Sequence, residues 1–287
     1  MIVGTVVLLA LASLLFWDTS QQDPAAPMAP ATPVSAASPP PPSVLNISCD
    51  EDLCGRKEPP VVQAVLLETA KVTPRGLAEL ARFPGLRSVE LNQVPVNDAA
   101  IAAIKKAAQI SRLVLADSGL NSQQVVSLSG CQNLLELGLQ GETLDSAALA
   151  GIGRMKQLKN LRLDGSSIND QGLDYLQSLP NLTLLSLAGT AVTSEGAVKL
   201  EKFDQVRELN LAGTRVGKAA LVHLARMPRL EVLHVQYTHI GPRCLEELKQ
   251  LKQVRVLEVS NNFSVHALIE LRQALPKTLV FNMGNHI

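Results

Sequence analysis

The feature that most constrains this chain is an apolar position that recurs at a constant spacing, with no insertion from one occurrence to the next. Every member of the series is Val or Leu: Val65, Val89, Leu113, Leu137, Leu161, Leu185, Leu209, Leu233 and Leu257. These residues are 24 positions apart, and a fixed period of this length is typical of stacked structural repeats. One repeat cannot bury its own leucines, so neighbouring repeats must share one continuous core.

Each repeat predicts a short strand, a turn and a short helix. Leu158, Leu161 and Leu163 alternate with other residues as in a half-buried strand, and Leu173 and Leu176 follow at a helical spacing. Between strand and helix lies a position whose residues suit a helix N-cap, because six of eight carry side-chain acceptors. These residues are Thr73, Asn97, Asn121, Asp145, Asn169, Thr193, Gly217 and Gly241.

The repeat resembles the leucine-rich repeat. The run from Leu187 to Gly196, LAGTAVTSEG, is similar to the L-x-L-x-x-T-x-[IV]-T-[DS]-x-G form common in bacterial proteins, and to repeats attached to F-box proteins. The resemblance covers roughly residues 60–282 and implies a curved α/β solenoid, with parallel strands on the concave face and short helices on the convex face. In that family a turn Asn bonds to neighbouring backbone. Here the position is mostly Ser or Thr, and Glu142 departs from the pattern.

The composition shifts along the chain predict five segments. Residues 2–17 form an apolar run that is short of the roughly 20 residues of a spanning helix and long for a signal peptide core of about 7–15 residues. We interpret the run as an uncleaved signal anchor, with a cleaved signal peptide as the alternative. The segments are 1–17 (anchor or signal peptide), 18–43 (disordered linker rich in Pro, Ala and Ser), 44–62 (N-terminal cap), 63–263 (leucine-rich repeats) and 264–287 (C-terminal capping repeat).

This leader predicts where the repeats lie. An anchor would tether them in the periplasm or at the cell surface, and cleavage would release them as a secreted protein. Cys49 and Cys54 stand in the N-terminal cap, where a disulfide is the interpretation that suits an extracytoplasmic protein. Two free thiols or two zinc ligands are the alternatives. A zinc site needs about four ligands, and no second Cys or His pair stands nearby, so we predict no metal.

The sequence carries no recognisable catalytic motif. No HExxH, no GxSxG and no glycine-rich phosphate loop occurs, so we predict no catalytic residues, no cofactor and no enzymatic activity. Cys131 and Cys244 fall at positions that other repeats fill with packed small or apolar residues, and we expect both to be packed.

The strand alternation predicts which side chains line the concave face. Three outward columns contain six acids and two bases, a mildly acidic balance that disfavours nucleic acid and anionic lipid as partners. Their richest polar cluster, with an aromatic residue expected at the rim, is the candidate binding site for a protein or peptide. It consists of Asn160, Arg162, Asp164, Glu208, Asn210, His234, Gln236 and Tyr237.

The carboxyl end departs from the period. A longer helix over 264–274 precedes a strand over 278–281, and we expect Leu279 to follow Leu257 in the interior, two positions short of a full period. The whole pattern predicts an extracytoplasmic, membrane-tethered scaffold that binds a protein or peptide and contacts the membrane only through its N-terminal segment. The alternatives are a substrate receptor of a ubiquitin-ligase-type assembly, suggested by repeat similarity, and an enzyme whose site is dispersed over the groove.

Overall fold

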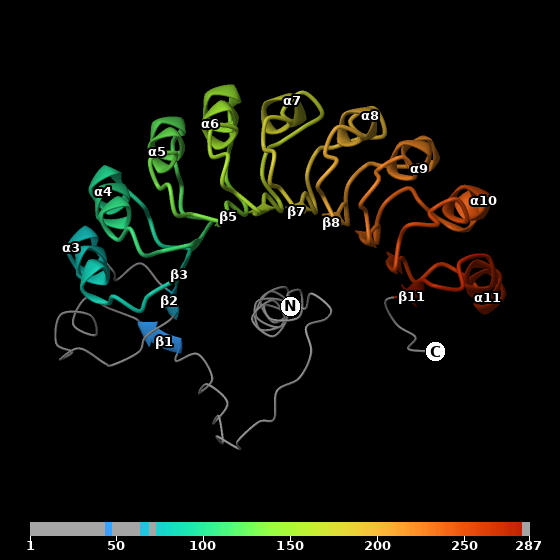
Figure 1. Ribbon diagram of the computed structural model, residues 1–287, viewed down its shortest axis with the longest axis horizontal. Helices are drawn as coiled ribbons and strands as arrows, with labels where there is room; N and C mark the ends of the chain where they lie inside the picture. Colours follow the sequence, from blue (N-terminus) through green and yellow to red (C-terminus); the bar gives the residue numbers. More distant parts are fainter. Residues whose placement is uncertain (1–43, 48–63, 69–72, 283–287) are drawn as a thin grey trace, which may run out of the picture. The chain divides into compact units, whose positions relative to one another are not determined.

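The computed structural model describes residues 44–47, 64–68 and 73–282, which form one repeat domain (Figure 1). Eleven strands in these residues make one parallel sheet, in which each strand pairs with the next along the chain. They are β1 (Val44–Ile47), β2 (Ala64–Glu68), β3 (Ser88–Asn92), β4 (Arg112–Ala116), β5 (Glu136–Gly138), β6 (Asn160–Arg162), β7 (Leu184–Ser186), β8 (Glu208–Asn210), β9 (Val232–His234), β10 (Val256–Val259) and β11 (Leu279–Asn282).

Short helices connect successive strands. They are α3 (Pro74–Ala78), the 3₁₀ turn η1 (Glu79–Arg82), α4 (Asp98–Lys106), α5 (Ser122–Leu128), α6 (Ser146–Ile152), α7 (Leu173–Leu176), α8 (Ala197–Leu200), α9 (Lys218–Leu224), the 3₁₀ turn η2 (Pro242–Cys244), α10 (Leu245–Leu248) and α11 (Val265–Ala274). Figure 1 shows the strands on the inner side of an arc and the helices on its outer side. Packed helices need about 8–10 Å between axes whereas paired strands need about 4.8 Å, so the stack must curve toward the strands.

The predicted interior column is confirmed. From Val89 to Leu257 each of its residues has 0% of its surface exposed, and each pairs in register with its counterpart one period away, as Leu161 does with Leu185. Other leucines and valines of the strands, turns and helices complete a single apolar core that runs the length of the domain. The repeats therefore hold together through contacts between neighbours.

The predicted side-chain N-caps are confirmed for three helices, α4, α5 and α6. The side chains of Asn97, Asn121 and Asp145 accept hydrogen bonds from the third backbone amide of α4, α5 and α6. Asn169 accepts from the amides of Gln171 and Gly172. The bonds of Asn97, Asn121 and Asp145 satisfy amides that have no partner within the helix, and so fix where α4, α5 and α6 begin. The prediction is wrong for Asn169 and Thr193, because α7 begins only after Gly172 and α8 only after Gly196.

A ladder of hydrogen bonds stabilises the turns at the position where the family carries Asn. Its hydroxyls donate to the backbone carbonyl three residues earlier, at 2.6–2.7 Å, from Ser166, Thr190, Thr214 and Thr238. Three of these four residues are buried, so the bond satisfies a polar group that would otherwise be costly inside the turn.

Glu142 replaces this ladder with a different contact. Only 3% of its surface is exposed, and its two carboxylate oxygens accept from the backbone amides of Ser118 and Leu120 in the preceding repeat, at 2.6 and 2.9 Å. The departure from Ser or Thr therefore does not break the turn stack, because the longer side chain reaches across one repeat.

The carboxyl-terminal register differs from the expected one. Leu257 pairs with Val280, only one position short of a full period, and Leu279 pairs with Val256. Val280 is consequently buried, whereas Leu279 is 62% exposed on the concave side. The expected pairing of Leu257 with Leu279 was wrong because hydrogen bonds of Thr278 to Val254 and of Leu279 to Arg255 align β11 one residue further along.

Several predictions concern residues outside the described part of the chain. These are the leader and linker over 1–43 and the pair Cys49 and Cys54. Strand β1 lies in the segment predicted as the N-terminal cap and extends the sheet there. None of the helices in residues 73–282 is long and apolar enough to cross a bilayer.

Candidate binding surface on the concave face

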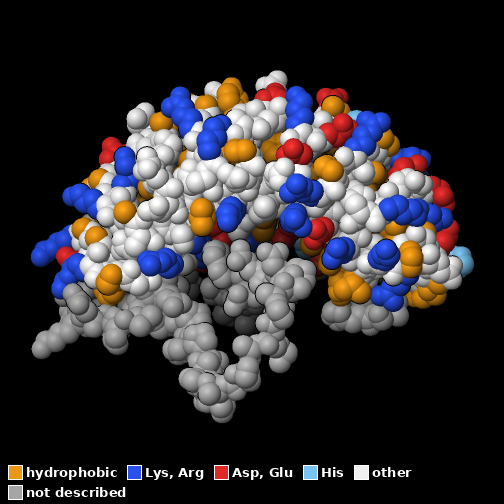
Figure 2. Space-filling model, viewed as in Figure 1, with side chains coloured by type: hydrophobic (Ala, Val, Ile, Leu, Met, Phe, Trp, Pro, Cys, Tyr) orange, Lys and Arg blue, Asp and Glu red, His pale blue; other side chains and the backbone are white. Residues whose placement is uncertain are grey.

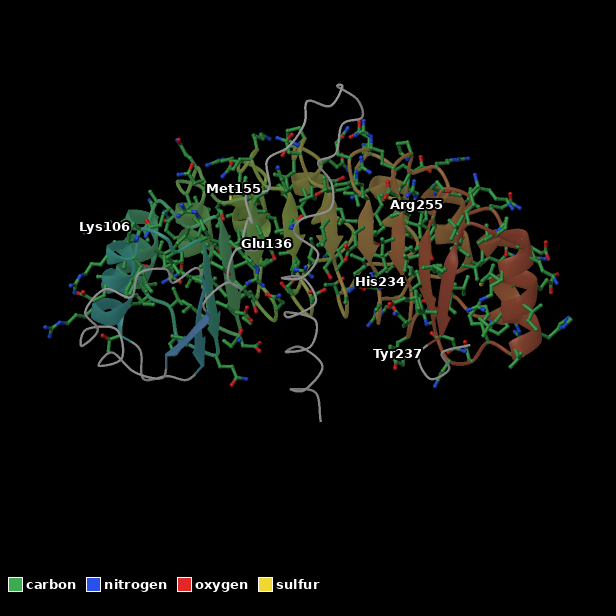
Figure 3. The ribbon with its side chains drawn as sticks, turned by 60° about the horizontal axis from the view of Figure 1, so that its bottom comes forward. Lys106, Glu136, Met155, His234, Tyr237 and Arg255 are labelled. Carbon is green, nitrogen blue, oxygen red and sulfur yellow. The ribbon has the colours of Figure 1, made fainter. Side chains whose placement is uncertain are left out.

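The strand register places the three predicted outward columns side by side on the concave face. Glu208 lies beside Val232, and Asn210 lies beside His234. Figure 3 shows Glu136 and His234 on this face, and Tyr237 at one rim of it. The eight candidate residues thus lie along one face, although Gln236 is buried, and their side chains fall into separate groups.

Asn160 and Arg162 belong to a group centred on Glu136, which we call the N-terminal ion network and define as Glu90, Arg112, Glu136 and Arg162. Arg112 contacts Glu136 at 3.0 Å and Glu90 at 3.3 Å, and Arg162 approaches Glu136 at 3.5 Å. Asn160 donates to the second oxygen of Glu136 at 3.4 Å. Glu136 is 5% exposed, so the network is largely withdrawn from solvent.

Asp164 turns toward the next repeat. Its carboxylate accepts a short hydrogen bond from the Ser186 hydroxyl and another, at 2.9 Å, from the backbone amide of Ala188. Asn210 likewise accepts from the backbone amide of Ala212, two residues along, at 3.0 Å. Both side chains therefore stabilise the turns at the ends of their strands and remain partly exposed on the face.

Glu208, His234 and Gln236 converge with Glu258, and we call these four residues the His234 cluster. The His234 Nδ1 lies 2.7 Å from a Glu258 oxygen, and its Nε2 lies 3.8 Å from Glu208. Gln236 donates to the same Glu258 oxygen, while its own Oε1 is buried with no hydrogen-bond partner in the described residues. Glu208 keeps the freest carboxylate of the cluster, with 40% of its side chain exposed.

The two carboxylates control the charge of His234. Burial alone would lower the pKa of the imidazole, but the contacts with Glu208 and Glu258 outweigh burial and raise the pKa to about 9. Reciprocally, the hydrogen bond from His234 lowers the pKa of Glu258. His234 is therefore a cation at neutral pH, paired between two carboxylates.

Tyr237 projects from the rim, as the sequence predicts. It is 63% exposed, and its φ of 57° lies in the left-handed region. The equivalent positions of the four preceding repeats are glycines with φ between 65° and 73°: Gly141, Gly165, Gly189 and Gly213. A tyrosine is strained in this conformation, and its amide is held there by a 2.8 Å hydrogen bond to the Ser260 hydroxyl.

The charges divide the concave face into two unlike parts. Along β3 to β6 the two acids and two bases of the N-terminal ion network neutralise one another. From Asp164 onward the outward columns of the described residues carry three carboxylates, Asp164, Glu208 and Glu258, and one cation, His234, so two negative charges remain in excess. Lys and Arg side chains are scattered over the flank of the domain seen in Figure 2. In the sequence, Arg207 and Arg255 directly precede β8 and β10.

An apolar strip lies next to the His234 cluster. Val232, Val256 and Leu279 occupy one row across β9, β10 and β11, in line with Glu208 on β8. Phe281 pairs with Glu258 in the adjacent row and is 39% exposed. We call Val232, Val256, Leu279 and Phe281 the apolar strip.

Our sequence reasoning missed three parts of this surface. It placed Glu136 and Glu258 at outward positions but left them out of the candidate site, although each lies one strand away from a chosen residue. It also left out Leu279 and Phe281, because the expected pairing of Leu257 with Leu279 put Leu279 inside. The charge neighbours could have been found from the register, whereas the strip depends on the correct pairing of the last strand.

Other chemistry has little support in the described residues. A cavity of about 210 Å³ lies beside α4 and is lined in part by Lys105, Gly130 and Cys131. Burial raises the pKa of the Cys131 thiol, and Lys105 offsets this only in part, so no activated thiolate stands there at neutral pH. Cys244 is buried in the core, as expected. No group of three potential metal ligands gathers within residues 73–282.

The parallel sheet in chain order, the 24-residue register and the turn ladder define the described part of the chain as a leucine-rich-repeat solenoid. No protein-family model matches the chain, and no curated protein matches it.

Solved structures resemble it in fold. An internalin (InlF) from Listeria monocytogenes str. 4b F2365 has a TM-score of 0.52 and 15% identity, over 79% of this chain and 68% of the internalin. TLR13 in its complex with ssRNA13 has a TM-score of 0.51 and 17% identity, over 83% of this chain and 38% of that chain. At such identities the likeness concerns the fold, and function must be argued from the site.

Proposed function

We propose that this protein is an extracytoplasmic binding protein, tethered to a membrane by residues 1–17, that captures a protein or peptide on the concave face of its repeats. The observation that carries the proposal is the contrast between the two faces of the sheet. The interior columns are apolar and fully buried, whereas the outward columns hold partly exposed charged, amide and apolar side chains. Such extended concave surfaces are what solenoids use to bind partners.

The His234 cluster and Tyr237 make the carboxyl-terminal part of the face the preferred contact region. Glu208 and Tyr237 are the most exposed of the candidate residues there, and Tyr237 has a left-handed backbone at a position where four earlier repeats carry glycine and two others carry Gln93 and Asp117. Strain of this kind persists where the surroundings enforce it, and it clusters at functional positions. An exposed tyrosine is also the residue type enriched at binding hot spots.

A nucleic acid is a poorer fit to this face. The TLR13 structure contains ssRNA13, yet the concave columns here carry excess carboxylate charge from Asp164 onward. Phosphate groups need Lys and Arg for neutralisation, and the outward columns of the described strands contain only Arg112 and Arg162, both already paired with glutamates.

Partner capture by paired tryptophan variants tests the proposal. The full chain is purified with Asn210→Trp on the concave face or Lys202→Trp on the convex face, and each variant is used to capture partners from extracts of the producing cells. We expect the concave variant to lose the partners that wild-type protein and the convex variant retain. Equal capture by both variants would remove the concave face from the proposal.

Fractionation tests the location. Tethering predicts that the full chain sediments with membranes and that protease added outside the cytoplasmic membrane degrades the repeats. Repeats that are found with cytoplasmic markers and are protected from the protease would refute the extracytoplasmic placement and would favour the ubiquitin-ligase-type alternative.

A further inference from the structure

The carboxyl-terminal part of the concave face combines excess negative charge with exposed apolar surface. Glu208 is only loosely paired, at 3.8 Å from His234 with 40% of its side chain exposed. In the same row, three strands further along, Leu279 is 62% exposed. Val232 and Val256 lie between them and are partly buried. A carboxylate and an exposed leucine thus stand at the two ends of one short apolar row.

Exposed apolar side chains are unfavourable in water, and an incompletely paired carboxylate remains available for another contact, so both features suit a binding partner. Leu279 and Phe281 belong to the last strand of the described sheet and expose large apolar side chains on its concave side. On the concave side of the described residues, Leu279 and Phe281 are the exposed large hydrophobic side chains of the strands. Apolar surface that gathers beside charged residues is typical of a protein contact site.

The charge identifies the kind of partner. His234 balances one of the three carboxylates from Asp164 onward, so two negative charges remain on this part of the face. The N-terminal ion network has no such excess, because its acids and bases pair with each other. A complementary ligand therefore presents a cation to the His234 cluster and not to the network.

The register gives the spacing that the ligand needs. Three strand steps of about 4.8 Å separate Glu208 from Leu279, or about 14 Å along the row. An extended peptide advances about 3.4 Å per residue, so this span corresponds to about four residues. Residues four apart in an extended peptide point to the same side, and two side chains at that spacing can meet both ends of the row.

We infer that the His234 cluster and the apolar strip together bind an extended peptide segment in which an Arg or Lys contacts Glu208 and an aliphatic or aromatic residue, about four positions away, packs on Leu279. This inference rests on the proposed function and specifies its partner. The basic side chain supplies the charge that the cluster lacks, and the apolar one covers the strip.

Peptide selection tests the inference on the full chain. Random twelve-residue peptides displayed on phage are selected on immobilised protein, and enriched peptides are synthesised with a fluorescent label for anisotropy measurements. We expect enriched sequences with Arg or Lys and an apolar residue about four positions away. Replacing the peptide's basic residue by Gln, or Glu208 by Gln, should each weaken binding about fivefold or more.

Two double-mutant cycles decide whether these side chains meet. If they do, combining the peptide's basic-to-Gln change with Glu208→Gln should cost little more than either change alone. In the second cycle, combining the peptide's apolar-to-Ser change with Leu279→Ser should likewise weaken binding little more than either change alone. Glu195→Gln and Val198→Ser, exposed positions away from the face, serve as matched controls and should leave binding unchanged.

Three results would overturn the inference: additive cycles, enriched peptides without a basic residue, or no enrichment at all. None of these three results decides whether the proposed function is correct, because that function has its own test. If peptides of another chemistry are enriched and Asn210→Trp still weakens their binding, the concave face remains the binding surface. Failure of that variant to reduce partner capture would instead reject the proposed function itself.

Discussion

Tyr237 lowers the stability of the fold through its strained backbone, while its exposed ring is expected to bind a partner. A left-handed backbone destabilises a residue that has a Cβ by about 1–2 kcal/mol. A glycine avoids this strain, but its greater loss of conformational entropy on folding costs about 0.5–1 kcal/mol. Tyr237→Gly should therefore raise the free energy of unfolding in urea by about 0.5–1 kcal/mol while weakening partner capture. Tyr237→Ala keeps the strain and removes the ring, so it should weaken capture without the gain in stability.

The opposite result for this pair is informative. If Tyr237→Gly captures partners as well as wild-type protein does, the exposed ring has no part in binding. The strain would then need another explanation, such as the 2.8 Å bond from the Tyr237 amide to Ser260.

His234 gives the fold a pH dependence of known sign. Its pKa is raised from 6.5 to about 9 in the folded state, so its stabilising contribution is complete below about pH 6.5 and is lost as pH rises through about 9. Between these values the free energy of unfolding should fall by up to about 1.4 kcal/mol per pH unit. Urea unfolding of wild type and His234→Gln across pH 6 to 9.5 measures this difference.

The comparison with His234→Gln isolates one group. The charged groups that contact His234 in the described residues are Glu208 and Glu258, and both stabilise the charged imidazole. Parallel stability curves for the two proteins would show that His234 titrates with an ordinary pKa, and would contradict the description of the cluster.

At the scale of elements, the turn ladder shows how one long side chain replaces a short one. Glu142→Gln keeps the shape but leaves only one oxygen for the buried amides of Ser118 and Leu120. An unsatisfied buried amide costs about 1–3 kcal/mol, so this variant should lose about that much stability in urea unfolding. Glu195→Gln, at an exposed position, is the matched control and should change stability by less than about 0.5 kcal/mol. A Glu142 variant as stable as wild type would mean that these amides have other partners.

The internal elements could be predicted well because their determinants are local and repeated. A strand that alternates around Leu161 and a cap such as Asn121 need only nearest neighbours, and the 24-residue period copies them. The 24-residue period is not kept at β11. Leu279 and Val280 are both apolar, so alternation does not decide which one is buried, and the answer depends on hydrogen bonds from Thr278 and Leu279 to the preceding repeat.

The candidate site was predictable in position but not in its pairings. Strand alternation placed Arg162 and His234 on the concave face, where the structure has them. Which carboxylate each one contacts depends on side-chain conformation across two or more strands. Arg162 contacts Glu136 on the neighbouring strand. Glu258 accepts hydrogen bonds from both His234 and Gln236. Neither arrangement follows from the spacing of the residues in the sequence.

For the whole molecule, stacking in register predicts that a complete repeat can be removed. Deleting residues 161–184 joins Asn160 to Leu185, which restores an interior leucine at the correct place and leaves the His234 cluster intact. This deletion should still unfold cooperatively, with a smaller denaturant m-value because less surface is buried. Deleting 161–172 removes half a period, puts helical residues in a strand position and should abolish cooperative unfolding. Equal behaviour of the two deletions would contradict the repeat account.

The proposed function places recognition on the strand side of the stack. Photo-crosslinking in the producing cells locates the partner, with p-benzoylphenylalanine placed at residue 210 on the concave face or at residue 202 on the convex face. We expect covalent adducts with a partner protein from position 210 and none from position 202. Adducts from position 202 alone would contradict the proposed function.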